Sequence, residues 1–229
     1  YGTIGIGAPY AGDGTAANRY KYFAFGLNSA KDRKVIIDFE NCTEINITCG
    51  AGTHNIIFYG QDVNIKNASV VVDCSTTTGS CVVFSSTSGE ITAEDCRFEV
   101  NGYDKCYIAG NGTFTRCFGK VINTYAGFCF DVSTNGLLKL YGGEFYAYTK
   151  SSGAVNAVVN IEETATQAVA VLYGANCPTV SVAGAYQTYA VRQLAGHAMC
   201  YGTITALTIS TLSTSLNSGQ INRTKPGRL

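Results

Sequence analysis

A cluster of charged side chains near residue 95 is the part of the sequence best suited to acid–base chemistry. Its members are Glu94, Asp95, Arg97, Glu99 and Asp104. Enzymes that cleave polysaccharides on a β-sheet fold place acidic residues on one solvent-facing strand to move protons to and from the sugar. If the strand is regular, Asp95 and Arg97 share a face, because residues two apart point the same way. If the protein is an enzyme, Glu94, Asp95 and Asp104 are therefore its candidate catalytic residues.

An ordinary solvated strand face explains the same cluster, and we favour that interpretation. Two basic residues, Arg116 and Lys120, are expected one repeat away. The second acidic pair, Glu162-Glu163, is expected at a turn, because adjacent strand residues point to opposite faces. Neither a G-x-S-x-G elbow nor a histidine triad motif occurs in the sequence. Whether the protein is an enzyme stays open, and the sequence favours one that is not.

The charge balance argues against a polyanionic partner. Among 229 residues, sixteen Lys and Arg are balanced by sixteen Asp and Glu, so the formal net charge is zero. Nucleic acids and anionic membranes attract basic surfaces, and we expect neither partner. The longest apolar runs are far shorter than the roughly eighteen residues that span a bilayer, so no membrane insertion is expected. The chain opens at Tyr1 without a Met or a signal peptide, which indicates a processed product or a piece of a longer protein.

The composition favours an all-β fold. The chain has 26 Gly, 15 Tyr and 11 Phe but only three Pro, one Met and no Trp, a mixture rich in strand and turn formers. Short alternating apolar stretches are separated by Gly, Ser and Asn clusters. One exception is Tyr22 to Ala30, whose apolar residues fit the face of a short helix. We expect this helix to cap the N-terminal end of the fold.

An internal repeat of about 24 residues predicts a parallel β-helix. With Gln61, Gly89, Gly112 and Gly136 as starting points, the spacings are 28, 23 and 24 residues, a period typical of stacked units. Two residues after each start, and again nine residues after it, stands an apolar residue; these are Val63, Ile91, Phe114 and Leu138, then Val70, Phe98, Val121 and Phe145. A β-sandwich, the main alternative, predicts no such register. We expect a capping segment over 1–34, a β-helix of six or seven coils over 35–212, and an extended tail over 213–229.

The ten cysteines allow two interpretations. They fall into sequence pairs, which are Cys42/Cys49, Cys74/Cys81, Cys96/Cys106, Cys117/Cys129 and Cys177/Cys200. An even count predicts a disulfide ladder in a secreted protein, and so do five N-x-S/T sites, at Asn41, Asn46, Asn67, Asn111 and Asn222. We favour the alternative of reduced thiols stacked inside the coils, with Cys81, Cys106 and Cys129 in one column. Without a CxxC motif and with only two His, neither a metal nor another cofactor is expected.

Tyrosines and a neutral C-terminal third suggest binding surfaces. Tyr can stack on sugar rings at modest entropic cost, and nine tyrosines spread over the coils predict either a glycan surface or interior packing; they are Tyr103, Tyr107, Tyr125, Tyr141, Tyr146, Tyr148, Tyr186, Tyr189 and Tyr201. Beyond residue 150 charge nearly vanishes, as in Ala165 to Leu172. Such a neutral wall suits subunit contact, and a solenoid that associates in parallel would close into a homotrimer.

The N-terminal part resembles the entry segment of pectate-lyase-like right-handed parallel β-helix proteins. The residues that carry the resemblance are Gly12-Asp13-Gly14-Thr15, then Phe23, Leu27-Asn28 and Ala30, then Lys34 to Phe39. Ala16-Ala17-Asn18 depart from the pattern, since the family has acidic residues there. Together with the Gly- and Asn-rich coils, the chain looks like the β-helical part of bacteriophage tail fibres and tailspikes, over about residues 10 to 150.

The resemblance implies a host-facing virion protein that is homotrimeric and recognises a surface glycan, which some members also cleave. Assembly in a bacterial cytoplasm would suit reduced thiols. No cleavage motif of the family matches, so the resemblance implies no catalytic residue. Two alternatives stay open: a secreted polysaccharide lyase or hydrolase, and a secreted structural protein or adhesin laddered by disulfides.

Overall fold

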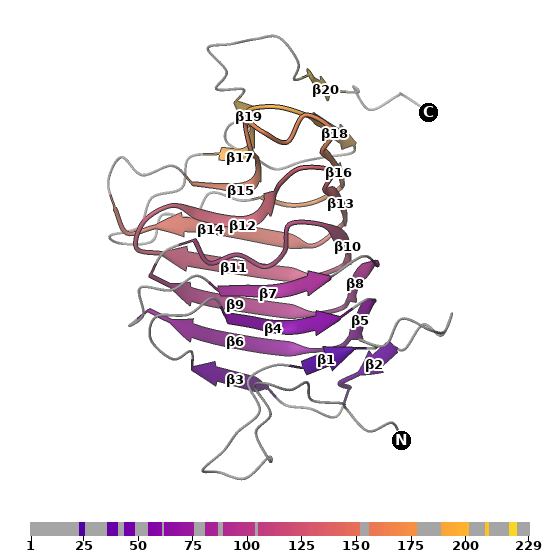
Figure 1. Cartoon of the computed structure of the whole chain (residues 1–229), viewed down its shortest axis with the longest axis vertical. Helices are drawn as coiled ribbons and strands as arrows, with labels where there is room; N and C mark the ends of the chain where they lie inside the picture. The colour runs from indigo at the N-terminus through magenta and orange to yellow at the C-terminus, as the bar shows by residue number, and fades with distance from the viewer. Residues whose placement is uncertain are drawn as a thin grey trace.

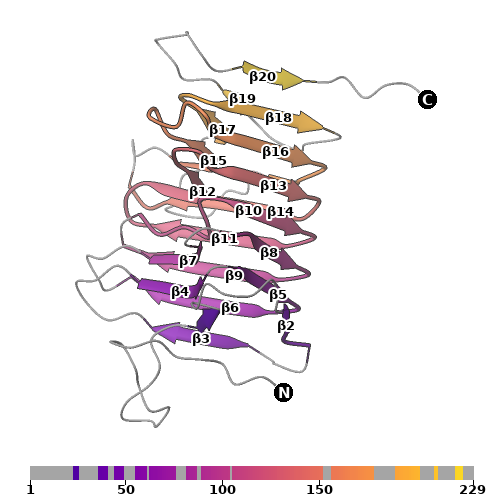
Figure 2. The same cartoon turned by 45° about the vertical axis from the view of Figure 1, so that its right-hand side comes forward.

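The computed structural model is a parallel β-solenoid. It describes residues 23–25, 36–40, 44–48, 55–60, 62–75, 81–86, 89–103, 105–151, 156–177, 189–201, 209–210 and 220–223. About five turns are described on all three faces, and more strands extend the stack at both ends. Figures 1 and 2 show the coils stacked from the N-terminal to the C-terminal end. The prediction of an all-β parallel β-helix is confirmed. The described segments contain no helix with the length and apolar character that crossing a bilayer requires.

The strands of the solenoid lie on three faces, and all strand pairs are parallel. The first face, in two sheets, holds β1 (Phe23–Phe25), β4 (Asn55–Gly60), β7 (Cys81–Ser86), β12 (Gly127–Val132), β15 (Asn156–Ile161), β17 (Tyr189–Gln193) and β19 (Ile209–Ser210). The second, which we call sheet B, holds β2 (Ile36–Asp38), β5 (Val63–Lys66), β8 (Ile91–Glu94), β10 (Gly112–Thr115), β13 (Leu137–Tyr141), β16 (Val169–Tyr173), β18 (His197–Tyr201) and β20 (Gln220–Arg223). The third, sheet C, holds β3 (Ile45–Thr48), β6 (Ser69–Cys74), β9 (Arg97–Gly102), β11 (Phe118–Asn123) and β14 (Glu144–Thr149).

Stacked apolar side chains from the three faces form one core along the solenoid axis. Phe58 stacks on Phe84 with ring centroids 5.1 Å apart, and Phe84 meets Phe114 at 5.7 Å. Phe130 continues the series, 4.9 Å from Phe114 and 5.2 Å from Phe145. Each coil alone exposes its apolar face, and stacking the coils buries it.

The predicted repeat is right in its alternation and wrong by two residues in one coil. Val63 pairs with Ile91 as expected, but the third member of this row is Gly112 rather than Phe114, and Leu138 follows. Phe114 instead lies beside Ala93 and Leu140. A shift of two residues preserves which side chains point inward, because the side-chain period of a strand is two. All eight residues predicted to be apolar and inward are therefore buried.

The predicted N-terminal helix is wrong where the structure describes it. Phe23–Phe25 form strand β1, which pairs in parallel with Phe58–Gly60 of β4. The alternation of aromatic residues around Ala24 suits a strand, and pairing covers the edge that β4 would otherwise expose. The rest of the expected helix, and the remainder of the capping segment over 1–34, lie outside the described residues.

The turn that follows sheet B has the same form in five consecutive coils. Its first residue has a positive φ in each of these, from 51° at Arg116 to 65° at Gly142; the others are Asn67, Asp95 and Gly174. The backbone N–H of each such residue donates to the coil above, as from Asp95 to the Thr115 carbonyl at 3.0 Å. The turn therefore holds the end of sheet B in the same position in these five coils.

The described cysteines are mostly buried thiols. Seven carry thiols: Cys81, Cys96, Cys106, Cys117, Cys129, Cys177 and Cys200. Cys74 is disulfide-bonded, and Cys42 and Cys49 lie outside the described residues. The bridge between Val82 and Tyr107 places Cys81 beside Cys106, as the predicted column requires. Cys129 does not join it, because the bridge between Ala109 and Phe130 places Cys129 beside Ile108 instead.

Candidate functional site

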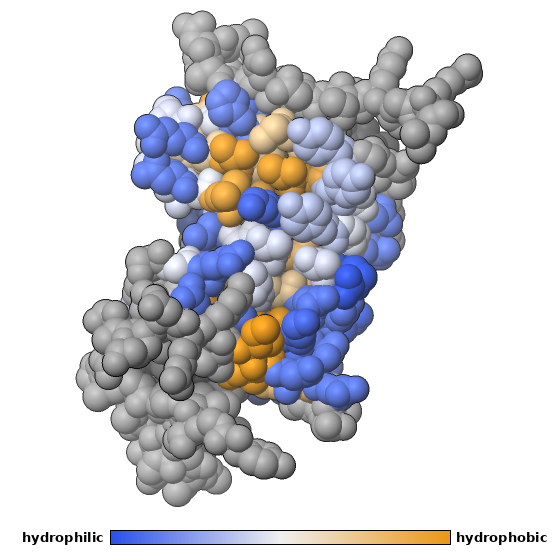
Figure 3. All heavy atoms as spheres, turned by 90° about the vertical axis from the view of Figure 1, so that its right-hand side faces the viewer, coloured by the Kyte–Doolittle hydropathy of each residue, from blue (hydrophilic) through white to orange (hydrophobic). Residues whose placement is uncertain are grey.

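The outer face of sheet B is the candidate functional site. Its strands stay in register, so residues at one position of successive coils form columns along the axis. The outward column nearest the turn to sheet C runs through Asp38, Lys66, Glu94, Thr115, Tyr141, Tyr173 and Tyr201. Its N-terminal half is charged and its C-terminal half is aromatic. Figure 3 shows this face: strongly hydrophilic residues gather at the lower right beside a hydrophobic group, and paler and hydrophobic residues lie above them.

Three tyrosines from consecutive coils form a ladder at the C-terminal end of this column. The ring of Tyr173 lies 6.5 Å from that of Tyr141 and 6.2 Å from that of Tyr201, centroid to centroid. The rings are tilted by 45° and 34°, so they do not stack face to face. Tyr173 is 58% exposed and Tyr141 40%. An exposed aromatic ring held on a rigid strand is a surface on which a sugar or another ring can stack.

A hollow of about 310 Å³ lies on the same face, at the beginnings of β8, β10 and β13. Leu137, which is 46% exposed, and Lys139 of β13 line its upper side. Asn111 and Thr113 of the coil below line the other side. In the part of the chain that is described, the side chains of Asn111, Thr113 and Lys139 have no hydrogen-bond or ion-pair partner. The hollow therefore offers an amide, a hydroxyl and an ammonium group to a ligand.

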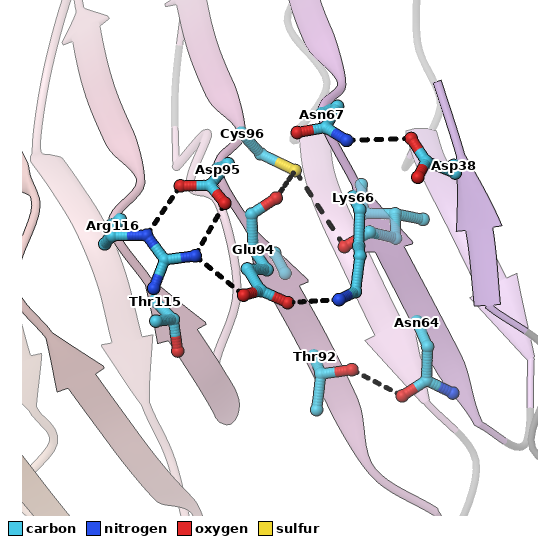
Figure 4. A network of polar contacts seen from close by, with 12 residues as sticks. Asp38, Asn64, Lys66, Asn67, Thr92, Glu94, Asp95, Cys96, Thr115 and Arg116 are labelled. Carbon is cyan, nitrogen blue, oxygen red and sulfur yellow. Dashed lines mark hydrogen bonds and ion pairs between the residues drawn. The ribbon is translucent and has the colours of Figure 1, made fainter. Parts of the chain in front are cut away.

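Ion pairs connect the charged half of the column, as Figure 4 shows. The Glu94 carboxylate accepts from Lys66 Nζ at 2.5 Å and from Arg116 Nη2 at 2.7 Å. Arg116 also donates to both oxygens of Asp95, through Nε at 2.8 Å and Nη2 at 2.6 Å. A neighbouring turn is fixed in the same way, since Asn67 Nδ2 donates to Asp38 Oδ1 at 2.8 Å. The charged groups of these side chains are therefore already engaged in ion pairs and hydrogen bonds with one another.

The ion pairs lower the pKa of both candidate acids. The pKa of Glu94 lies below its ordinary value because of the hydrogen bonds from Lys66 and Arg116. The pKa of Asp95 is lowered by its hydrogen bonds with Arg116. A general acid for glycoside cleavage needs the opposite shift, so that it still carries a proton near neutral pH. The geometry gives Glu94 and Asp95 a structural role in holding successive coils together.

The rest of the predicted charged cluster is split between faces. Asp95 lies in the turn, with a φ of 53°, and Arg97 begins β9 on sheet C. The regular strand that would align them is therefore absent. Arg97 donates to Glu99, which also lies 3.7 Å from Lys120 of the next coil. The basic residues Arg116 and Lys120 lie one coil away from these acids, as the sequence predicts. Asp104 lies outside the described residues.

The nine tyrosines singled out in the sequence lie in different environments. Tyr148 is buried, Tyr146 hydrogen-bonds Glu144, and Tyr103 pairs with Tyr125 at 5.5 Å. Tyr107 is half-buried, while the side chains of Tyr186 and Tyr189 are outside the description. Tyr141 and Tyr201 are brought together by Tyr173, which the sequence analysis missed. A Tyr-Gly dipeptide at each of the three positions, Tyr141-Gly142, Tyr173-Gly174 and Tyr201-Gly202, is the signal that could have found it.

The described residues bring no three His, Cys, Asp or Glu side chains into a group that could hold a metal ion. Comparison of the chain with protein-family models, with curated proteins and with solved structures gives no match. The case for a function therefore stands on the geometry of the face itself.

Proposed function

We propose that this chain is a glycan-binding β-solenoid of the tail-fibre and tailspike kind. In this proposal it holds a host-surface carbohydrate on the outer face of sheet B without cleaving it. The observation that carries the proposal is the ladder of Tyr141, Tyr173 and Tyr201, of which Tyr141 and Tyr173 are exposed. Apolar faces of sugar rings stack on tyrosine, and a tyrosine on a strand loses little entropy when it binds.

The hollow on the same face supports the same proposal. Sugar recognition combines ring stacking with a few convergent polar groups that fix orientation. Asn111, Thr113 and Lys139 supply such groups within the same face as Tyr141. The lowered pKa values of Glu94 and Asp95 favour binding without hydrolysis. The resemblance of the N-terminal segment implies a homotrimeric virion protein, which we propose here as the setting for this face.

The test is glycan binding by the full chain and by three variants. An array of bacterial surface glycans identifies a ligand, and calorimetry then measures its affinity. We expect Tyr173→Ala and Tyr141→Ala each to weaken binding about two- to twelvefold, since an aromatic contact contributes about 0.5–1.5 kcal/mol. Tyr125→Ala is the matched control, because Tyr125 is 47% exposed but lies away from sheet B, in the loop between β11 and β12.

Three results decide the proposal. Selective loss in the sheet B variants supports it. The proposal is overturned if the array retains no glycan, or if Tyr125→Ala weakens binding as much as the sheet B variants do. Chromatography of the glycan after incubation tests the second part: unchanged chain length supports binding alone, whereas shortened products would establish a polysaccharide-cleaving enzyme instead.

A further inference from the structure

Cys96 and Cys117 occupy the same turn position in consecutive coils. The Phe118 N–H donates to the Cys96 carbonyl at 2.8 Å, and Arg97 pairs with Phe118 across the two strands that follow. The two cysteines are therefore neighbours in register. Adjacent strands lie about 4.8 Å apart, which is inside the range of about 4.4–6.8 Å between the Cα atoms of a disulfide.

The two thiols also interact. Cys117 hydrogen-bonds the Cys96 sulfur, which lowers the pKa of Cys96 and raises that of Cys117. The sulfurs face backbone oxygens, with Cys96 Sγ 3.1 Å from the Glu94 carbonyl and Cys117 Sγ 3.5 Å from the Ala93 carbonyl. No cation contacts either sulfur among the described side chains. The sulfur with the lower pKa is the better source of a thiolate at neutral pH.

The pair lies just beneath the surface. Cys96 and Cys117 are 3% and 1% exposed, but each directly follows an exposed turn residue, Asp95 or Arg116. A local opening of this turn would therefore be enough to expose both sulfurs to solvent. Cys129, in contrast, lies in strand β12, fully buried and away from any turn.

We propose that Cys96 and Cys117 form a redox-modification site at which a low-molecular-weight disulfide, such as oxidised glutathione, converts the two thiols into a disulfide across neighbouring coils. The Cys96 thiolate attacks one glutathione sulfur, forms a mixed disulfide and releases one glutathione thiolate. The Cys117 thiolate then attacks the Cys96 sulfur and releases the second. The protein loses two electrons and two protons, and the glutathione disulfide gains them as two thiols.

This cross-link would join one coil to the next. In a solenoid each coil contacts only its neighbours, so opening one coil–coil contact separates the stack into two parts. A covalent bond at this turn holds the two coils in register while other contacts open. The oxidised protein should therefore resist heat better than the reduced protein.

The test is incubation of the full chain with oxidised glutathione, below the melting temperature and without reductant. Remaining thiols are then alkylated and the protein is digested for mass spectrometry. We expect a cross-linked peptide that joins Cys96 to Cys117, and a melting temperature several degrees above that of the reduced protein. Cys117→Ser should lose the cross-link and accumulate a Cys96–glutathione adduct, whereas Cys129→Ser, the matched control, should keep the cross-link.

Two outcomes overturn the proposal. One is alkylation of both cysteines after prolonged incubation. The other is a cross-link within the sequence pairs, Cys96 to Cys106 or Cys117 to Cys129. Both outcomes are measured on the wild-type chain, so they test the proposal even if a variant fails to fold.

Discussion

Two adjacent glycines in the turn between β13 and β14 should respond very differently to alanine. Gly142 and Gly143 both have a positive φ, 65° and 86°. A Cβ on Gly142 would meet nothing within 4 Å, and coils below carry Arg116 and Asp95 at this position. A Cβ on Gly143 would lie 2.3 Å from the Cys117 carbonyl oxygen. Both substitutions strain the backbone, but only one collides with the neighbouring coil.

The difference in cost follows from these contacts. For Gly142→Ala we expect the cost of a left-handed alanine, about 1–2 kcal/mol. Gly143→Ala adds a displacement of the Cys117 carbonyl, which accepts the Glu144 N–H at 2.9 Å. Overpacking costs about 1–3 kcal/mol and the loss of such a hydrogen bond about 1 kcal/mol. The second variant should therefore be less stable than the first by about 2–4 kcal/mol.

Thermal unfolding followed by far-ultraviolet circular dichroism measures this difference. For a chain of this size each kcal/mol lowers the melting temperature by about 2–4 °C. We expect Gly143→Ala to melt at least about 4 °C below Gly142→Ala. Gly142→Asn should come closest to the wild type, because Asn tolerates the left-handed region. Equal melting temperatures for the two alanine variants would refute the assigned contact between the coils.

Two further predictions concern ionisable groups. Burial raises the pKa of Asp131, whose Oδ1 accepts from Asn160 Nδ2 at 2.6 Å. Stability is therefore lost as pH rises from the ordinary Asp pKa through the raised one, so Asp131→Asn should resist urea better than the wild type at pH 7 and equally well below about pH 4. The lowered pKa values of Glu94 and Asp95 give stability that is present above their ordinary values and lost as pH falls through the lowered ones. Arg116→Gln should raise the pKa of Asp95 in an NMR titration and leave that of Asp73, which is held low by hydrogen bonds to Ser75, unchanged.

Alternation along each strand is the property of this fold that the sequence predicts well. Inward positions such as Val70 and Phe98 carry apolar residues, because any polar residue there would be buried without a partner. Placing the third coil two residues late does not disturb this pattern, since two is the side-chain period. Fold class and inward residues can thus be predicted without the correct coil lengths.

Neighbours across coils cannot be predicted in this way, because the coils differ in length. Corresponding residues of sheet B stand at Ile91, Gly112, Leu138 and Ala170, so successive coils vary through insertions in their loops. Pairing cysteines by closeness in sequence therefore separates Cys96 from Cys117. The tyrosine ladder is missed for the same reason, as its members are 32 and 28 residues apart.

The residue that each coil contributes to the outer column of sheet B explains why a ligand would bind at the C-terminal end of this column. In the N-terminal half, Lys66, Glu94 and Arg116 saturate one another, and a ligand would have to break ion pairs to bind there. In the C-terminal half the same position holds three tyrosines whose rings lie beside one another, and Tyr141 and Tyr173 remain exposed. Threonine at this position, as in Thr115, is sufficient to continue the sheet. Large aromatic rings in three consecutive coils are therefore not required to continue the sheet. A bound partner would bury the apolar surface that these rings expose to water.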